Sequence, residues 1–192
     1  MKSILLAGAL GLAVSVAYAA PTKYDIDPDH TYPTFEADHM GGLSVLRGTF
    51  KSTSGSITLD KAAKAGTIDI TIDATSLAFT NDKLSEHAKK DPKMFDVAKY
   101  PTVTFKGKLS KFSGENPTEA TGDLTLHGVT KPVTLKINQF LCKQHPMKKK
   151  EVCGADVSGT INRYDFGVTY GDNFGFKPEV KLAIEVEAVV AG

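Results

Sequence analysis

Apolar and polar residues alternate along most of this chain, and the clearest case is the segment 180–190. Every even-numbered position from Val180 to Val190 is apolar, whereas Lys181, Glu185 and Glu187 stand at odd positions. A period of two is typical of a β-strand with one dry and one solvated face. Because the apolar faces must come together, a sheet that closes on itself encloses either packed side chains or a ligand.

The same alternation recurs in short segments separated by turn residues such as glycine and proline. The further strand-like segments are 34–39, 47–59, 67–73, 102–105, 123–126, 133–137 and 151–161, of which 47–59 could be one long strand or a bent pair. Short connections between strands favour antiparallel pairing. We therefore predict an all-β fold, an eight-stranded antiparallel barrel, because closure removes unpaired strand edges.

One short segment, residues 81–90, predicts a helix. Asn81 or Asp82 can cap its start, and Pro92 follows its end. A helix of this length cannot cross a sheet. We expect it to lie as a lid or plug at one mouth of the barrel.

The first 19 residues have the features of a secretory signal peptide. Lys2 precedes an apolar run over residues 4–16, and Ala17 and Ala19 flank the expected cleavage site after Ala19. A membrane anchor is the alternative, but about 20 apolar residues are needed to span a bilayer. We expect a bacterial periplasmic protein with one domain, residues 20–192.

The two cysteines, Cys142 and Cys153, agree with export. An oxidising compartment pairs cysteines, so we expect a disulfide. A metal pair or a reactive thiol is the alternative, although the ten intervening residues do not match the usual short metal-ligand spacing.

Charge and motifs exclude several classes of function. Lys2 is the only charged residue among the first 19, so residues 20–192 hold 22 basic and 22 acidic residues. A chain without net charge has no overall field to hold nucleic acid. The sequence contains no nucleophile elbow and no glycine-rich phosphate loop, so we expect a protein that is not an enzyme.

Four blocks of residues, taken in order, resemble the YceI family of exported bacterial proteins. They are residues 24–30 followed by Phe35 and His39, residues 91–105 preceded by His87, residues 122–133, and residues 163–167. The resemblance implies a lipocalin-like barrel whose long cavity takes an amphiphilic isoprenoid, either a polyprenyl phosphate or a long-tailed quinone. A soluble carrier must hide such a tail, since each buried methylene gains about 0.8 kcal/mol.

The candidate ligand-binding residues lie on apolar positions or inside these blocks. For the tail we expect Phe35, Phe50, Phe79, Leu84, Met94, Phe95, Phe105, Leu126 and Phe166. Ordinary core packing is the alternative for the aromatic residues, and the two interpretations overlap in a ligand-binding barrel. We expect His39 and His87 to line a mouth and to donate hydrogen bonds to the polar head of the ligand.

The remaining polar candidates have simpler interpretations. The five histidines show no metal-binding spacing, so we expect no metal site, and His30 and His127 are interpreted as buried structural residues. Arg163 could meet a phosphate, but such an arginine more often pairs with a carboxylate at a barrel end. The lysines around 143–150 form either a solvated turn or a weak contact with anionic head groups.

The sequence thus predicts a periplasmic carrier of an isoprenoid lipid, with no covalent cofactor. The alternative is an accessory of a membrane redox or stress-response system that presents a quinone to a membrane cytochrome b, as the family resemblance suggests. A small hydrolase or isomerase that uses the same pocket is a third class. Whether the protein is a monomer or a homodimer stays open.

Overall fold

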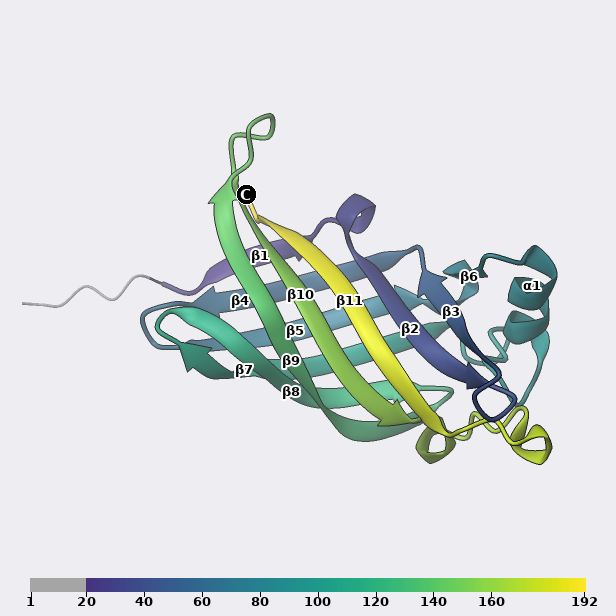
Figure 1. The fold of residues 1–192 in the computed structure, drawn as a ribbon. Helices are drawn as coiled ribbons and strands as arrows, with labels where there is room; N and C mark the ends of the chain where they lie inside the picture. Colours follow the sequence, from purple (N-terminus) through teal and green to yellow (C-terminus); the bar gives the residue numbers. More distant parts are fainter. Residues whose placement is uncertain (1–19) are drawn as a thin grey trace, which may run out of the picture.

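The computed structural model describes residues 20–192, so the predicted signal peptide lies outside the described residues. Strands make up most of the fold (Figure 1). The strands are β1 (Thr22–Ile26), β2 (Tyr32–His39), β3 (Ser44–Phe50), β4 (Thr53–Asp60), β5 (Ala65–Asp73), β6 (Leu77–Phe79), β7 (Thr102–Ser113), β8 (Asn116–Leu126), β9 (Val129–Gln144), β10 (Glu151–Asn162) and β11 (Glu179–Val190).

The helical elements are few and short. They are α1 (Asp82–Lys90) and four 3-10 helices, η1 (Pro28–His30), η2 (Ala74–Ser76), η3 (Arg163–Phe166) and η4 (Asp172–Phe174). Among the described residues, no helix is long and apolar enough to cross a bilayer.

The eleven strands form a closed barrel of eight rows, where a row is a strand or two consecutive strands that continue each other. The first three rows are β1 with β2, β4 with β3, and β5 with β6, and the strands β7 to β11 supply the other five. All pairings are antiparallel. Strand β11 pairs with β2 at Val180↔Ala37 and with β1 at Val190↔Tyr24, which closes the barrel. The predicted eight-stranded antiparallel barrel is confirmed.

The alternating pattern and the helix prediction both agree with the structure. In β11, Val180 and Ala188 are buried, whereas Lys181 and Glu185 on the other face are exposed. The segment 47–59 is the bent pair, because the chain leaves the ladder at residues 51–52 between β3 and β4. Strand β9 is much longer than the predicted 133–137, because the hairpin with β10 extends beyond the barrel (Figure 1).

Helix α1 lies at the end of the barrel beside β3 and β6 (Figure 1). The Asn81 side chain caps it by accepting hydrogen bonds from the Lys83 and Leu84 N–H groups at 2.9 and 3.2 Å. The buried Ser85 hydroxyl accepts a hydrogen bond from the Phe79 N–H at 2.8 Å, which fixes the helix against β6. The sequence-predicted helix at one mouth is therefore confirmed.

The first row is interrupted at Pro28, which has no N–H to donate to a ladder. At this interruption β11 lacks a strand to pair with. The hydroxyl of the fully buried Thr31 bonds the β11 backbone instead. This hydroxyl donates to the Glu187 carbonyl at 3.0 Å and accepts from the Glu187 N–H at 3.1 Å. The Asp27 N–H also donates to the Glu187 carbonyl, at 2.9 Å. These bonds keep the wall continuous where β2 gives way to β1.

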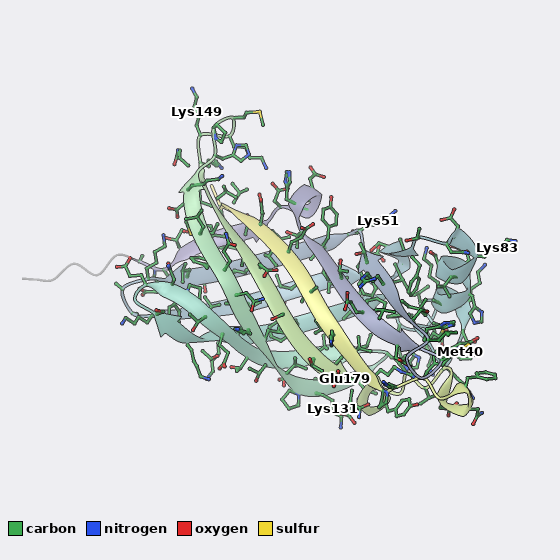
Figure 2. All side chains as sticks on the ribbon, viewed as in Figure 1. Met40, Lys51, Lys83, Lys131, Lys149 and Glu179 are labelled. Atoms are coloured by element: carbon green, nitrogen blue, oxygen red, sulfur yellow. A yellow bond between two sulfur atoms is a disulfide. The ribbon has the colours of Figure 1, made fainter. Side chains whose placement is uncertain are left out.

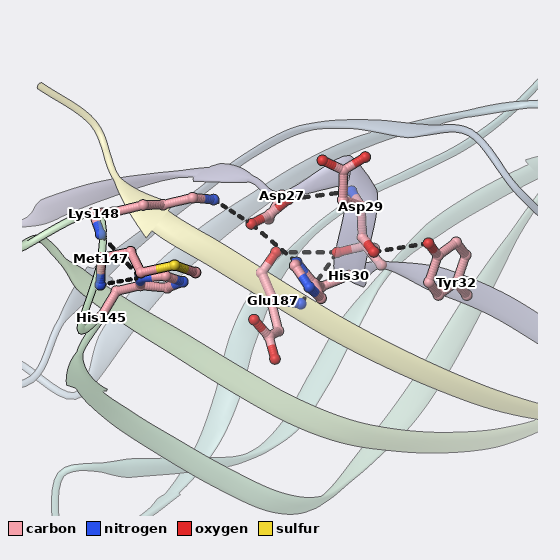
Figure 3. Close-up of polar contacts among 9 residues, drawn as sticks. Asp27, Asp29, His30, Tyr32, His145, Met147, Lys148 and Glu187 are labelled. Atoms are coloured by element: carbon pink, nitrogen blue, oxygen red, sulfur yellow. Dashed lines mark hydrogen bonds and ion pairs between the residues drawn. The ribbon is translucent and has the colours of Figure 1, made fainter.

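Two contacts hold the β9–β10 hairpin, one between its own strands and one to the barrel. Cys142 and Cys153 stand opposite each other in the two strands and form the expected disulfide. Beyond them, the Lys148 ammonium donates to the buried Asp27 carboxylate at 2.6 Å (Figure 3). Asp27 also accepts from the Asp29 N–H and faces His30 at 3.3 Å.

The hydrogen bond from Lys148 is the main reason that the pKa of Asp27 lies below its ordinary value of 3.8, and burial of the carboxylate opposes this shift. His30 itself is exposed, so the expectation that it is a buried structural histidine is wrong. It lies on the surface because the turn at Pro28 carries it outside the sheet.

We predict that Lys148→Ala lowers the free energy of unfolding by about 1 kcal/mol at neutral pH. A carboxyl whose pKa is lowered on folding contributes stability above its unfolded pKa and loses it as the pH falls. The difference from the unmodified protein should therefore shrink below about pH 5 and vanish near pH 2. Denaturant unfolding at pH 7 and at pH 2 measures it.

Lys143→Ala, in the same hairpin but without an ion pair, is the matched control and should change stability by less than about 0.5 kcal/mol. An equal effect of Lys148→Ala at both pH values would contradict a role for the Asp27 charge.

Candidate ligand-binding cavity

The barrel interior holds two neighbouring cavities. The mouth cavity, of about 310 Å³, lies at the end that carries α1, and the inner cavity, of about 150 Å³, lies toward the disulfide. Both are lined by Pro33, Ile72, Phe105, Leu135 and Ile184, so they follow each other inside the barrel with one ring of side chains between them.

Ten of the eleven sequence-predicted ligand-binding residues line the mouth cavity. They are Phe35, His39, Phe50, Phe79, Leu84, His87, Met94, Phe95, Phe105 and Leu126. The sequence analysis chose them by apolar position or by their place in the family blocks, and the barrel brings them together from β2, β3, β6, β7, β8, α1 and the segment that follows α1. Their contact with a ligand stays a prediction.

Phe166 is the exception and corrects the sequence interpretation. Its side chain is only 2% exposed, yet it lines neither cavity. It belongs to η3, directly after β10, where the chain has left the alternating pattern. We therefore remove Phe166 from the candidate ligand-binding residues.

Phe35 is the centre of an aromatic cluster in the wall of the mouth cavity. Its ring centroid lies 6.1 Å from that of Phe50, 5.8 Å from Phe79 and 5.9 Å from Phe95. The ring also lies directly over Gly48, where a Cβ would come within 2.4 Å of Cζ of Phe35. A side chain at position 48 would therefore displace the ring, which explains why glycine stands in this strand.

Four rings border the mouth of the cavity. The ring centroid of His39 lies 5.0 Å from that of Phe176. The Phe176 centroid lies 6.3 Å from that of Tyr170, and the Tyr170 centroid lies 5.1 Å from that of His87. All four line the mouth cavity. The structure thus places His39 and His87 together in the lining of this cavity, and their hydrogen bonds to a ligand head stay a prediction.

Tyr170 and Phe176 were missed by sequence reasoning. They lie in the long connection between β10 and β11, where no alternation indicates which side chains point inward. The one available signal is that each aromatic residue is next to a glycine with positive φ, Gly171 or Gly175. Such glycines mark tight turns that direct neighbouring side chains.

Each histidine at the mouth has one polar neighbour. His39 Nδ1 lies 3.3 Å from the Ser44 hydroxyl, and His87 Nε2 lies 3.7 Å from the Asp91 carboxylate. An imidazole has two ring nitrogens. Each ring therefore keeps a second nitrogen for another partner.

Arg163 lines the mouth cavity and is 7% exposed, but it does not pair with a carboxylate as expected. Its guanidinium donates to the carbonyls of Val168, Lys177 and Phe176 at 2.9, 3.2 and 3.3 Å. Among the described residues, no carboxylate oxygen lies within salt-bridge distance of it.

The reason is that the β10–β11 connection folds back over Arg163, so its own carbonyls satisfy the buried donors. Burial lowers the pKa of Arg163 from its ordinary value. The side chain therefore places a positive charge in the cavity wall without a neutralising partner in contact.

The inner cavity is lined almost wholly by apolar side chains, among them Ile57, Ile68 and Ile70. Tyr24 supplies one polar group at its boundary, and its hydroxyl donates to the Glu151 carboxylate. Burial, together with this hydrogen bond, raises the pKa of Tyr24. The sequence pattern identified the three isoleucines as inward-facing, but it could not tell that the space between them is unfilled.

One further cluster lies on the outside of the barrel. Asp27, His30 and Glu187 come within 4.8 Å of one another, a spacing that could hold a cation. The Lys148 ammonium already contacts Asp27. We therefore build no metal site on this cluster.

The family model described as "YceI-like domain" matches residues 24–188, which is most of the described chain. The chain belongs to the YceI-like family. A UPF0312 protein of Enterobacter sp. (strain 638) is 37% identical over 98% of both chains. The sequence-based recognition of the YceI family is therefore confirmed.

Solved structures share the barrel. BcnA of Burkholderia cenocepacia has a TM-score of 0.68 at 22% identity, covering 85% of this YceI-like chain and 99% of that one. A domain from Saccharophagus degradans, described as polyisoprenoid binding and implicated in plant cell wall breakdown, has a TM-score of 0.61 at 15% identity and covers 88% and 98%. At these identities the two structures show the common fold.

We predict that Gly48→Ala lowers the free energy of unfolding by about 1–3 kcal/mol, because the new methyl group displaces the Phe35 ring against its aromatic neighbours. Gly154→Ala is the control, since a Cβ there meets its nearest atoms at 3.8 Å. Denaturant unfolding compares the two. Equal stability of both variants would mean that the Phe35 ring is not confined.

Proposed function

We propose that this protein is a periplasmic carrier that binds an amphiphilic isoprenoid lipid, with the tail in the two cavities and the polar head at the mouth. The observation that carries the proposal is the pair of adjoining apolar cavities inside a closed barrel. A tightly filled interior would have argued for a purely structural domain.

The chemistry of the interior fits a hydrocarbon tail. The lining consists mainly of aliphatic and aromatic side chains, and a cavity of about 310 Å³ lies within the usual range of ligand sites. Each methylene moved from water into such a site gains about 0.8 kcal/mol. The net affinity is smaller, because the tail also loses conformational freedom on binding.

The chemistry of the mouth fits a polar head. His39 and His87 each have a ring nitrogen free for a further partner, and both border the opening. The Arg163 guanidinium has no carboxylate within salt-bridge distance among residues 20–192, but the carboxylates of Asp38, which also lines the mouth cavity, and Asp172 offset part of its charge. An imidazole can hydrogen-bond a phosphate or a quinone carbonyl, so the mouth fits the head of either ligand.

Relatives support the ligand class but do not identify the ligand. The S. degradans domain is described as polyisoprenoid binding, and the family resemblance points to the same class. At 15% identity its contacts cannot be transferred residue by residue, so the cavity of this chain carries the argument.

Location and reaction class complete the proposal. The signal-peptide pattern of residues 1–19 and the Cys142–Cys153 disulfide both fit an exported protein. A hydrophobic cavity with binding groups at its rim fits a binding protein better than an enzyme. The alternative role, presentation of a quinone to a membrane cytochrome b, stays a prediction that no contact in this chain favours.

Native mass spectrometry of the purified protein, followed by organic extraction, tests the proposal. We expect one bound lipid with a prenyl tail per chain. A bound quinone would favour the redox alternative. A chain that stays empty when incubated with both prenyl phosphates and quinones would contradict the carrier function.

We predict that Ala37→Phe lowers the amount of bound lipid by about tenfold, because the ring occupies the mouth cavity that Ala37 lines. Extraction and mass spectrometry measure the bound lipid. Ala183→Phe, on the exposed face of β11, is the control and should bind as the unmodified protein does. Similar lipid contents in the two variants would argue against the mouth cavity as the site.

We predict that the double variant His39→Ala, His87→Ala lowers the amount of bound lipid several-fold without a comparable loss of stability, because the head loses hydrogen-bond donors. The readouts are lipid content and thermal unfolding. His30→Ala, on the outer surface, is the control. An unchanged amount of co-purified lipid in the double variant would contradict the proposed role of the two histidines.

A further inference from the structure

Exposed apolar side chains gather at the mouth of the barrel. Of seven large apolar side chains that are exposed among residues 20–192, five belong to the β2–β3 hairpin or to the β10–β11 connection. Four of these five form what we call the loop-tip patch, and their exposed fractions are 51% for Met40, 73% for Leu43, 50% for Val45 and 66% for Phe174. Single exposed apolar residues are ordinary, but a group at one end of a molecule marks an interaction site.

The Asp38 carboxylate holds the two loops together. Its Oδ2 accepts from the Gly41 N–H at 2.9 Å and from the Lys177 N–H at 3.0 Å, so one oxygen joins the two segments. A Cβ on Gly41 would lie 3.4 Å from the Gly175 carbonyl oxygen, which shows how closely the two backbones approach. Both glycines have positive φ, a conformation that favours glycine.

The loop-tip patch continues the rim of the mouth cavity. His39 lines the cavity and Met40, the next residue, is exposed. In the other loop, Phe176 lines the cavity and Phe174, two residues earlier, is exposed. The rings of His39 and Phe176 contact each other, so a molecule that leaves the cavity past these two rings also passes by the patch.

We propose that the loop-tip patch inserts into the interface of a lipid bilayer and holds the mouth of the barrel against the membrane. This inference rests on the proposed function, because an isoprenoid tail that moves between bilayer and cavity along the patch avoids exposure to water. Apolar side chains carried on protruding loops are suited to the boundary between head groups and acyl chains.

The size of the patch favours a bilayer over a second copy of the chain. An aromatic side chain has about 150–250 Å² of surface, and the smaller aliphatic side chains have no more than this. Four side chains that are half to three-quarters exposed therefore supply less than the ~800 Å² per partner of a stable protein interface. A fluid bilayer requires no matching surface, and because Asp38 lies beside Lys177 near Gly42, the apolar side chains rather than net charge would hold the loops there.

The opposite end of β11 offers an internal comparison. There the β9–β10 hairpin exposes Leu141 and Met147 among several lysines, and Figure 2 shows Lys149 on this hairpin far from Met40. The hairpin has exposed apolar residues, but among the described residues none from 138 to 152 lines the mouth cavity. The hairpin is therefore the alternative surface through which the protein could bind a membrane. Variants in the hairpin serve as the matched control for variants in the loop-tip patch.

Flotation with protein-free vesicles of phosphatidylethanolamine and phosphatidylglycerol tests the proposal, using residues 20–192 and intact disulfide. We expect the unmodified protein to float with the vesicles and Leu43→Ser, Phe174→Ser to lower the partition coefficient about tenfold. The control Leu141→Ser, Met147→Ser should stay within about twofold of the unmodified protein. All four positions are exposed, so thermal unfolding should change little.

Three results would overturn the proposal. One is an unmodified protein that does not float, and another is loss of flotation in the hairpin variant alone. The third is a solution dimer that only the loop variant disrupts while its vesicle binding is unchanged, which would assign the patch to a second copy.

The bound-lipid measurement on the same samples keeps this test separate from the carrier function. A protein that carries a prenyl lipid but does not bind vesicles through the loops refutes the docking inference alone. A protein that docks through the loops but never carries a lipid refutes the carrier function alone.

Discussion

The pairing of β11 with both β2 and β1 is the interaction on which the rest of the structure depends. One strand contacts two strands of the first row because Thr31 supplies the hydrogen bonds that Pro28 interrupts. Closure gives the backbone groups of the rows partners in the wall itself. The interior can then stay partly hollow, because no polar backbone group inside it requires a partner.

The hollow interior is differentiated along its length. The inner cavity is aliphatic and is bounded near the disulfide by the Tyr24–Glu151 hydrogen bond. The mouth cavity is aromatic, centred on Phe35, and its rim carries imidazole, phenol and guanidinium groups. This order, from aliphatic interior through aromatic wall to polar rim, matches the order of groups in an amphiphile with a long tail.

The two ends of the barrel are built for different purposes. At one end the disulfide joins the two strands of a long hairpin, and the Lys148–Asp27 ion pair fixes this hairpin to the wall. At the other end Asp38 joins two glycine-rich loops that carry apolar tips beside the opening. The hairpin contacts stabilise the fold. The loops joined by Asp38 instead expose apolar surface, which does not contribute to stability.

The sequence alone determined much of this protein. Alternation predicted the barrel and the inward faces of its strands, capping residues predicted the short helix that starts at Asn81, and the family blocks added candidates outside the strands, such as Met94 and Phe95. The strand period and the helix cap are local properties, since both are visible within a few neighbouring positions. Only the tertiary structure decided the partners of Arg163, the inward direction of Tyr170 and Phe176, and the displacement of Phe166 from the cavity. They lie in or beside the β10–β11 connection, whose path depends on contacts with Lys93, Asp38 and its own carbonyls rather than on any repeating pattern.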